Sequence, residues 1–264
     1  MWYEGGFLDR EEIWDETREF FDLNENIKRG FYGIDDPQVL SEANKVVNNL
    51  YGADMDYVMD NTKFPYIPVD IEVPHEDIFK EANHLLYTSC YTAHRPASSG
   101  WLSLAIHGMS SVHTNCPEDY GMPDSAEEDL STWTDIAKFC PKTVEWMKEE
   151  VNYDAFTRVR FMALLPGGWL GNHRDRDSIK GIGATNIAIN NPDGCDMVLG
   201  DWGKVPFKPG MAVKLNTGYE HSVWNRSEEP RIHMIFDGAP NDIFKRKVNQ
   251  SYHKIIHYAN MLGT

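Results

Sequence analysis

The spacing of apolar and polar positions divides the sequence near residue 155. Before that point, apolar side chains recur every three or four residues over several stretches, which is typical of helices that bury one face. After it, short runs rich in Val, Ile, Phe and Met are separated by clusters of Gly, Pro, Asn and Asp. Their spacing is close to the roughly 8–12 residues expected of an all-β sandwich or barrel. These runs are residues 156–165, 184–190, 195–199, 211–215, 221–224 and 231–236.

Turn-forming sequences separate several of these runs. Residues 191–194 read Asn-Pro-Asp-Gly and residues 208–210 read Lys-Pro-Gly, and these residue types favour tight turns. Strands that return one after another favour an antiparallel double sheet that curls on itself, a jelly roll.

The two ends of the chain are predicted to be mostly helical. The clearest helix begins at Pro74, where proline suits the first helical turn, and carries Ile78, Ala82 and Leu85 at helical spacing. Two alternating or glycine-bounded runs in the same region favour strands. The expected helices are residues 37–52, 74–86, 131–139, 141–150 and 242–262, and the expected strands are 66–73 and 100–108.

These patterns predict a mainly β protein of the α+β class with flanking helices at both ends. We expect an N-terminal helical and mixed segment at 1–97, which packs on the core. The jelly-roll core is expected at 98–240, and a helical tail at 241–264.

The composition indicates a globular protein and excludes two classes of partner. Hydrophobic residues make up 41% of the 264 residues and aromatic residues 12%, which is typical of a chain with a substantial core. The formal net charge is −16 at pH 7, whereas nucleic acids and anionic membranes require clustered Lys and Arg. We therefore expect no nucleic-acid and no membrane partner, and the oligomeric state is left open.

No targeting or zinc-binding pattern is apparent. No run approaches the ~18 consecutive apolar residues of a membrane span, and residues 1–6 lack the basic-then-apolar pattern of a signal peptide. Cys90, Cys116, Cys140 and Cys195 form no C-x-x-C pair, so reduced thiols are expected rather than a structural zinc site. The expected location is the cytoplasm.

One His-x-Asp motif has a setting that suits a metal. His173 and Asp175 follow a predicted strand and a Pro-Gly-Gly turn, in a loop between strands, and His221 begins another strand. A second match at His75 starts a predicted helix, where acids favour the helix dipole, and we interpret it as a chance match. Two imidazoles and one carboxylate form the facial triad that holds non-haem Fe(II) and leaves coordination positions open.

Arg231 lies in an apolar strand ten residues after His221. The polar turn at 225–229 fits a hairpin, which would place both residues on neighbouring strands facing the same interior. A guanidinium buried without a partner is costly, and a bidentate carboxylate relieves that cost. An internal salt bridge to an Asp or Glu is the alternative. Together with the triad, a bound dicarboxylate is the favoured interpretation.

A series of short motifs lies in order between Trp101 and Asp237. They are Trp101-Leu102-Ser103-Leu104-Ala105-Ile106, Cys140-Pro141, Arg158-Val159-Arg160-Phe161, Leu165-Pro166-Gly167-Gly168, His173-Arg174-Asp175, Asn186-Ile187-Ala188-Ile189, Gly194-Cys195, Pro209-Gly210, His221-Ser222-Val223-Trp224-Asn225 and Arg231-Ile232-His233. The ordered set resembles the Fe(II)/2-oxoglutarate oxygenases of the aspartyl/asparaginyl β-hydroxylase type, which include free-proline cis-hydroxylases.

The resemblance implies a cupin-like double-stranded β-helix with Fe(II) held by His173, Asp175 and His221. It further implies that the distal carboxylate of 2-oxoglutarate pairs with Arg231. The full triad, with an acidic ligand at Asp175, is closer to the members that carry all three ligands than to β-hydroxylases that lack the acid.

Three further positions carry weaker implications. Asn186 matches a position where relatives commonly have a histidine that helps to hold the cosubstrate, and its amide can still form hydrogen bonds. Arg160 matches an arginine that relatives keep near the substrate. Where relatives often show Arg-x-His, this chain has Ala184-Thr185-Asn186, so no particular substrate is carried over. His233 shares strand parity with Arg231 and is either part of the site or a core histidine.

The expected activity is hydroxylation of an unactivated C–H bond in a free amino acid or in a residue of a peptide or protein. The reaction would use Fe(II), 2-oxoglutarate and O2, and release succinate and CO2. One alternative is a catalytically silent cupin-like protein that binds a metal or ligand, and cosubstrate turnover separates the two. Another is a cupin-type isomerase or dioxygenase without 2-oxoglutarate, which would not need Arg231.

Overall fold

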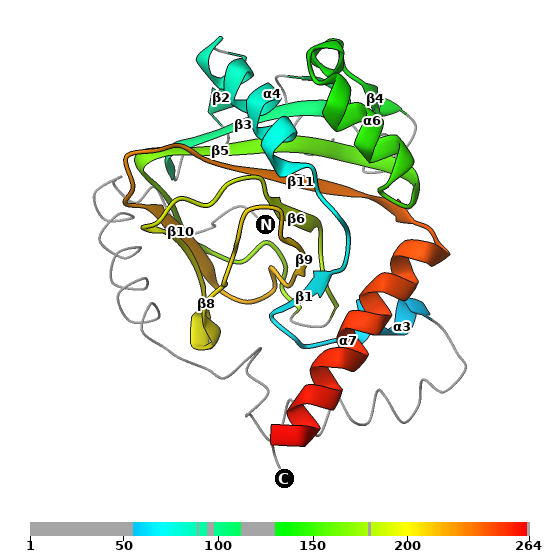
Figure 1. The fold of residues 1–264 in the computed structure, drawn as a ribbon. Coiled ribbons are helices and arrows are strands. Elements are labelled where there is room, and N and C mark those ends of the chain that lie inside the picture. Colours follow the sequence, from blue (N-terminus) through cyan, green and yellow to red (C-terminus); the bar gives the residue numbers. More distant parts are fainter. Residues whose placement is uncertain (1–54, 89, 94–97, 112–129, 179–180, 263–264) are drawn as a thin grey trace.

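The computed structural model of the chain describes residues 55–88, 90–93, 98–111, 130–178 and 181–262 (Figure 1). The helix predicted at 37–52 lies outside the described residues. The division of the chain into three parts stays a prediction.

Within the described ranges, eleven strands form one continuous antiparallel sheet in the order β1-β9-β6-β11-β5-β10-β7-β8, with β3 also paired to β5 and the short β2 and β4 paired to β3. The strands are β1 (Tyr66–Val69), β2 (Thr92–Ala93), β3 (Ser98–Gly108), β4 (Thr132–Trp133), β5 (Tyr153–His173), β6 (Thr185–Ala188), β7 (Cys195–Leu199), β8 (Gly203–Lys204), β9 (Ala212–Leu215), β10 (His221–Asn225) and β11 (Arg231–Pro240).

The long strand β5 belongs to both halves of this sheet. Its first part, up to Leu164, pairs with β11, whereas Trp169, Leu170 and His173 pair with β10. We call β1, β9, β6, β11, β3 and the first part of β5 the larger half-sheet. The second part of β5 with β10, β7 and β8 is the smaller half-sheet. The two halves curl around a common interior (Figure 1), which confirms the predicted jelly-roll core.

Helices flank the sheet on its outside. Helix α4 contacts α6 and β11, and α7 contacts β1, β11 and α3. None of the helices in the described ranges combines the length and apolarity that crossing a membrane would require. The helices are α3 (Met55–Asn61), α4 (His75–Tyr87), the 3₁₀ helix η3 (Asp135–Phe139), α6 (Pro141–Glu149), the 3₁₀ helix η4 (Gly200–Trp202) and α7 (Asp242–Leu262).

Local sequence and a tertiary contact together define where α6 begins. Pro141 occupies the first turn, where its missing N–H has no intrahelical partner to lose. The backbone N–H groups of Lys142 and Thr143 donate to the two carboxylate oxygens of Glu81 on α4, at 2.8 and 3.0 Å. Glu81 therefore caps α6 from a neighbouring helix and links the two helices.

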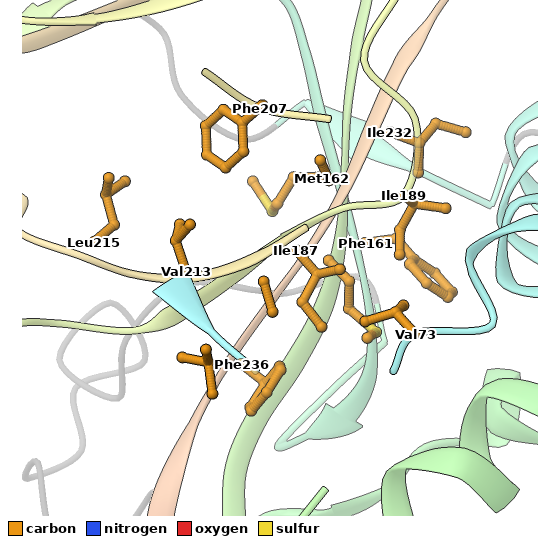
Figure 2. Close-up of a cluster of buried hydrophobic side chains, with 14 of the residues drawn as sticks. Val73, Phe161, Met162, Ile187, Ile189, Phe207, Val213, Leu215, Ile232 and Phe236 are labelled. Carbon is orange, nitrogen blue, oxygen red and sulfur yellow. The ribbon is translucent and has the colours of Figure 1, made fainter. Parts of the chain in front are cut away.

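Side chains alternate between the two faces of the larger half-sheet because successive strand residues point to opposite sides. Met162 of β5 lies beside Phe207 in the interior, whereas Phe161 and Phe236 point to the outer face (Figure 2). All four are buried. The sheet therefore has an apolar core on its outer face and an interior that apolar and polar side chains share.

The helix predicted at 131–139 is only partly correct. Thr132 and Trp133 form a short strand on β3, and only the following residues form the 3₁₀ helix η3. The Thr134 side chain donates to the Ala105 carbonyl at 3.0 Å, and its backbone N–H donates to the Ile106 carbonyl. These contacts to β3 outweigh local helical preference.

The expected Pro-Gly-Gly turn before His173 is not a separate turn. Residues 166–168 lie inside β5, and Gly167 adopts a φ of 69°, which glycine tolerates best. The strand changes its pairing partner on either side of this point. As a result, His173 is the last residue of a strand rather than part of a loop.

The predicted hairpin between His221 and Arg231 is also wrong. Strand β10 pairs with β5 and β7, and β11 pairs with β5 and β6. The turn between them carries the chain from the smaller half-sheet to the larger one. Both strands adjoin the same edge of β5, which is why His221 and Arg231 still belong to one interior.

Candidate metal centre and cosubstrate pocket

Three predicted ligands converge at one end of the interior. His173 ends β5, Asp175 follows it, and His221 begins β10. The Nε2 atom of His173 is 3.2 Å from one carboxylate oxygen of Asp175, and that of His221 is 3.9 Å from the other. Their ligand atoms all lie within 4.8 Å of one another, and this is the one such cluster of His, Cys, Asp or Glu in the described ranges.

Backbone carbonyls orient both imidazoles. His173 Nδ1 lies 2.7 Å from the Gly171 carbonyl oxygen, and His221 Nδ1 lies 2.9 Å from that of Tyr219. Carbonyl oxygens only accept, so each Nδ1 carries a proton, and Nε2 is the ring atom on the side of Asp175 that a metal could bind. This is the tautomer that a metal ligand needs. The donor set therefore fits a divalent iron ion.

The backbone of Asp175 is bonded to a neighbouring loop. Its N–H donates to the Thr217 carbonyl at 2.9 Å, in the loop that precedes His221. The carboxylate is 36% exposed, whereas His221 is almost fully buried. An open carboxylate beside two oriented imidazoles leaves room for further ligands on the solvent side.

Arg231 lies beyond the metal end, where the chain re-enters the larger half-sheet after β10. Its side chain is 1% exposed, and its guanidinium contacts Asn191 Oδ1 at 3.4 Å and His233 Nδ1 at 3.0 Å. The guanidinium also faces the Phe207 ring, 5.6 Å from its centroid. Within the described part of the chain it forms no ion pair, so the alternative of an internal salt bridge finds no support there.

Burial lowers the pKa of Arg231 to about 10, with smaller opposing effects from Cys195 and Asp196. The group thus remains a cation at neutral pH. A fully buried cation whose hydrogen-bond partners are both neutral is a strong site for a carboxylate, because the new ion pair would relieve the cost of its burial.

His233 and Asn186 extend this polar cluster. His233 Nδ1 lies 2.7 Å from Asn186 Oδ1. Burial, followed by the nearby Arg231, lowers the pKa of His233 well below its usual value, so the ring is neutral. A neutral Nδ1 either donates to Asn186 or accepts from Arg231, but not both. A carboxylate that engages Arg231 would resolve this competition and leave His233 bonded to Asn186.

Arg160 lies on the same face of the larger half-sheet as Arg231, His233 and Asn186. It pairs with Ile235 of β11, and Ile235 pairs with Asn186 of β6. Cross-strand neighbours share a face, and positions 231, 233 and 235 of β11 alternate with outward residues. Arg160, Asn186, His233 and Arg231 therefore emerge on one face, toward the interior.

Sequence reasoning left one residue undecided and missed another. His233 was balanced between site and core, and the structure places it in contact with both Arg231 and Asn186. Its parity with Arg231 was the signal available. The sequence indicates only that Asn191 belongs to a turn, and nothing in its local pattern indicates that its side chain reaches Arg231.

The sequence matches the family described as Aspartyl/Asparaginyl beta-hydroxylase over residues 76–240, which is more than half of the chain. Comparison with curated proteins gives no match. The family's cofactors, Fe(II), 2-oxoglutarate and O2, fit two oriented imidazoles, one carboxylate and a buried guanidinium.

Solved structures with a similar course of the chain include three hydroxylases. A prolyl-4-hydroxylase from Pseudomonas putida is 15% identical, with a TM-score of 0.39 and coverage of 71% of this chain and 97% of that one. The viral collagen prolyl hydroxylase from Paramecium Bursaria Chlorella virus-1 is 16% identical, with a TM-score of 0.36 and coverage of 65% and 94%. A prolyl hydroxylase from Trichoplax adhaerens is 11% identical, with a TM-score of 0.39 and coverage of 81% and 94%.

At these TM-scores the structural likenesses carry no part of the assignment. The assignment rests on the family match, on the ordered motifs and on the jelly-roll core that unites them. The protein belongs to the aspartyl/asparaginyl β-hydroxylase family and is a 2-oxoglutarate-dependent oxygenase.

Proposed function

We propose that the protein hydroxylates an unactivated C–H bond of a free amino acid or of a residue in a peptide or protein. Fe(II) would be held by His173, Asp175 and His221, and 2-oxoglutarate by Arg231. One observation carries the proposal: both histidines present Nε2 to one carboxylate, with each Nδ1 bonded to a backbone carbonyl.

The residues of the site would have separate roles. The triad would hold the metal and leave positions open for the cosubstrate and O2. Arg231 would receive the distal carboxylate as a bidentate partner, while Asn186, bonded to His233, would orient that end of the pocket. With Fe(II) and 2-oxoglutarate bound, the site would support oxidation by O2, one oxygen atom going to the new hydroxyl group and the other to succinate, with release of CO2.

The residues that share the interior face support this substrate class. Arg160 emerges there near Asn186 and offers a cation to a carboxylate or a polar backbone group of the substrate. Both a free amino acid and a residue within a peptide or protein present such groups. At the position where relatives often have an arginine, this chain has Ala184, so one contact that could distinguish the two kinds of substrate is missing.

The test is an anaerobic titration with Fe(II) and 2-oxoglutarate, followed by the weak visible charge-transfer band of the chelate. Wild type should develop the band, and His173→Ala should abolish it. Arg231→Met should still show it, but at roughly 100-fold more 2-oxoglutarate, because two charge-assisted hydrogen bonds are lost.

Arg226→Met is the matched control. Arg226 pairs with Asp196 and lies over Trp224, outside the metal cluster and the polar cluster around Arg231, so its removal should leave the titration unchanged. Succinate release with candidate substrates then follows. A wild-type protein that binds Fe(II) but neither forms the band nor releases succinate would be a silent binder, and the proposed function would be wrong.

A further inference from the structure

A short segment that precedes the family match touches both loops of the metal centre. Residues 59–66, here called the strap, run from the end of α3 into β1, and β1 pairs with β9. Tyr66, at the end of this segment, pairs with Leu215, the last residue of β9, and the loop to His221 begins there. Figure 1 shows β1 beside β9. The match to the family begins only at residue 76.

The strap binds the loop that follows the ligands His173 and Asp175. The N–H of Gly181 donates to the Thr62 carbonyl at 2.9 Å, and the N–H of Ile182 donates to the Met59 carbonyl at 2.8 Å. The approach is close: a Cβ on Gly181 would lie 3.0 Å from the carbonyl oxygens of Met59 and Asp60, and Gly181 has a φ of +80°. Only glycine fits this contact without displacing the strap.

The strap also binds the loop that precedes His221. The backbone N–H of Asn216 donates to the Pro65 carbonyl at 2.9 Å, and its side-chain amide donates to the Phe64 carbonyl at 3.2 Å. The Tyr219 hydroxyl donates to the Lys63 carbonyl at 2.8 Å. Tyr219 is the same residue whose carbonyl oxygen orients His221.

Asn216 joins the two loops to each other. Its Oδ1 atom accepts from the Arg176 guanidinium at 3.0 Å and from the Gly218 N–H at 3.2 Å. Arg176 donates in turn to the Gly181 carbonyl, and Asp175 bonds to Thr217. The side chain of Asn216 is completely buried. The loops and the strap therefore form one hydrogen-bonded unit.

From these contacts we propose that the strap positions the metal ligands, with Tyr219 and Gly181 as its two main points of attachment. The proposal rests on the proposed function of the triad. The Tyr219 hydroxyl bonds to the strap, and the carbonyl of the same residue orients His221. Gly181 bonds to the strap and belongs to the loop that follows Asp175. Loss of either attachment would widen the spread of ligand positions and weaken metal binding.

The test measures binding of Co(II), whose visible spectrum reports coordination geometry without any turnover. Two full-length variants each remove one attachment. Tyr219→Phe deletes only the hydroxyl that reaches the strap, and Gly181→Ala inserts a methyl group against Met59 and Asp60. Each should raise the Kd for Co(II) roughly tenfold and change the visible band.

Two matched variants control for loss of stability. Tyr91→Phe removes a buried tyrosine hydroxyl that also donates to a backbone carbonyl, that of Ala82 at 3.2 Å. Gly194→Ala places a side chain at a φ of +87° where the nearest atom lies 3.6 Å away. Tyr91→Phe should lose about as much thermal stability as Tyr219→Phe, and Gly194→Ala carries the backbone strain of a positive φ without the clash. Both variants should keep the wild-type Kd and spectrum.

The outcomes separate the two proposals. If Tyr219→Phe and Gly181→Ala bind Co(II) like their controls, the strap does not position the ligands, although the triad stands. If Gly181→Ala fails to fold, the comparison of Tyr219→Phe with Tyr91→Phe tests the proposal by itself. If wild type binds no Co(II), or binds it no better than His173→Ala, the metal centre itself is wrong and the strap proposal falls with it.

Discussion

The two ends of the jelly-roll interior are held in place by different means. At the metal end, backbone carbonyls orient His173 and His221, and a backbone bond holds the half-exposed Asp175. At the opposite end, the side chains of His233, Asn191 and Phe207 surround Arg231, and both Arg231 and His233 are buried completely.

This difference predicts how each end responds to change. Substitution of Asp175 should alter ligand binding with little effect on the fold, because its carboxylate is partly exposed. Substitutions at the Arg231 end should alter both ligand binding and stability, because a buried charge and its polar neighbours contribute to the free energy of folding.

The largest expected effect is at the metal end. Asp175→Ala should weaken Co(II) binding on the order of 1,000-fold, because one of three protein ligands is lost. The free energy of unfolding of the metal-free protein should change by less than about 0.5 kcal/mol. Calorimetric titration and urea denaturation measure the two quantities. A large loss of stability without metal would remove the contrast between the two ends.

Lys214 supplies a buried cation outside the interior and sharpens the comparison with Arg231. It alternates with Val213 on β9 and pairs with Thr185, so it faces away from the interior. Burial lowers the pKa of Lys214 to about 8, with Asp237 opposing the shift. Because its pKa in the folded state lies below the unfolded value, the unfolded chain binds more protons between the two values. Stability from this group therefore rises with pH.

The test is the difference between wild type and Lys214→Met across pH. At pH 7 the variant should be more stable by about 3 kcal/mol, and this advantage should shrink as pH rises from about 8 toward 10.5. Taking the difference cancels the titration of tyrosines and cysteines. A constant difference over this range would mean that Lys214 carries its charge in the fold without penalty.

Arg231→Met addresses the same cost inside the interior. Without ligand, the variant should be more stable than wild type by about 1–2 kcal/mol, since methionine fills similar space without a charge. With metal present, 2-oxoglutarate should raise the melting temperature of wild type but not of the variant. If the ligand-free variant loses more than about 2 kcal/mol, Arg231 serves the fold rather than a carboxylate.

The smallest expected effect concerns the contact between His233 and Asn186. A double-mutant cycle with Asn186→Ala and His233→Phe should give a coupling energy of about 1 kcal/mol in binding of 2-oxoglutarate. The same cycle read from unfolding without ligand should give less, because Arg231 then competes for His233 Nδ1. Equal coupling in both measurements would contradict this competition.

Prediction from sequence succeeded where a single stretch carries the signal. The strand 195–199 and the helix 242–262 have the predicted bounds, because each pattern of apolar residues depends only on its own period. Prediction failed where the structure depends on segments that are distant in the sequence. Residues 132–133 form a strand because they pair with β3, and β10 pairs with β5 and β7 rather than with β11.

The sequence by itself determined which residue types were available for chemistry: two histidines and an aspartate with strands before and after them, and an arginine in an apolar run. Only the tertiary structure decided how they are aimed. The carbonyls of Gly171 and Tyr219 set the imidazole tautomers, and the strap accepts hydrogen bonds through its backbone. Every residue has a carbonyl, so the residue type does not reveal which ones will receive these bonds; closure of the sheet alone selects them.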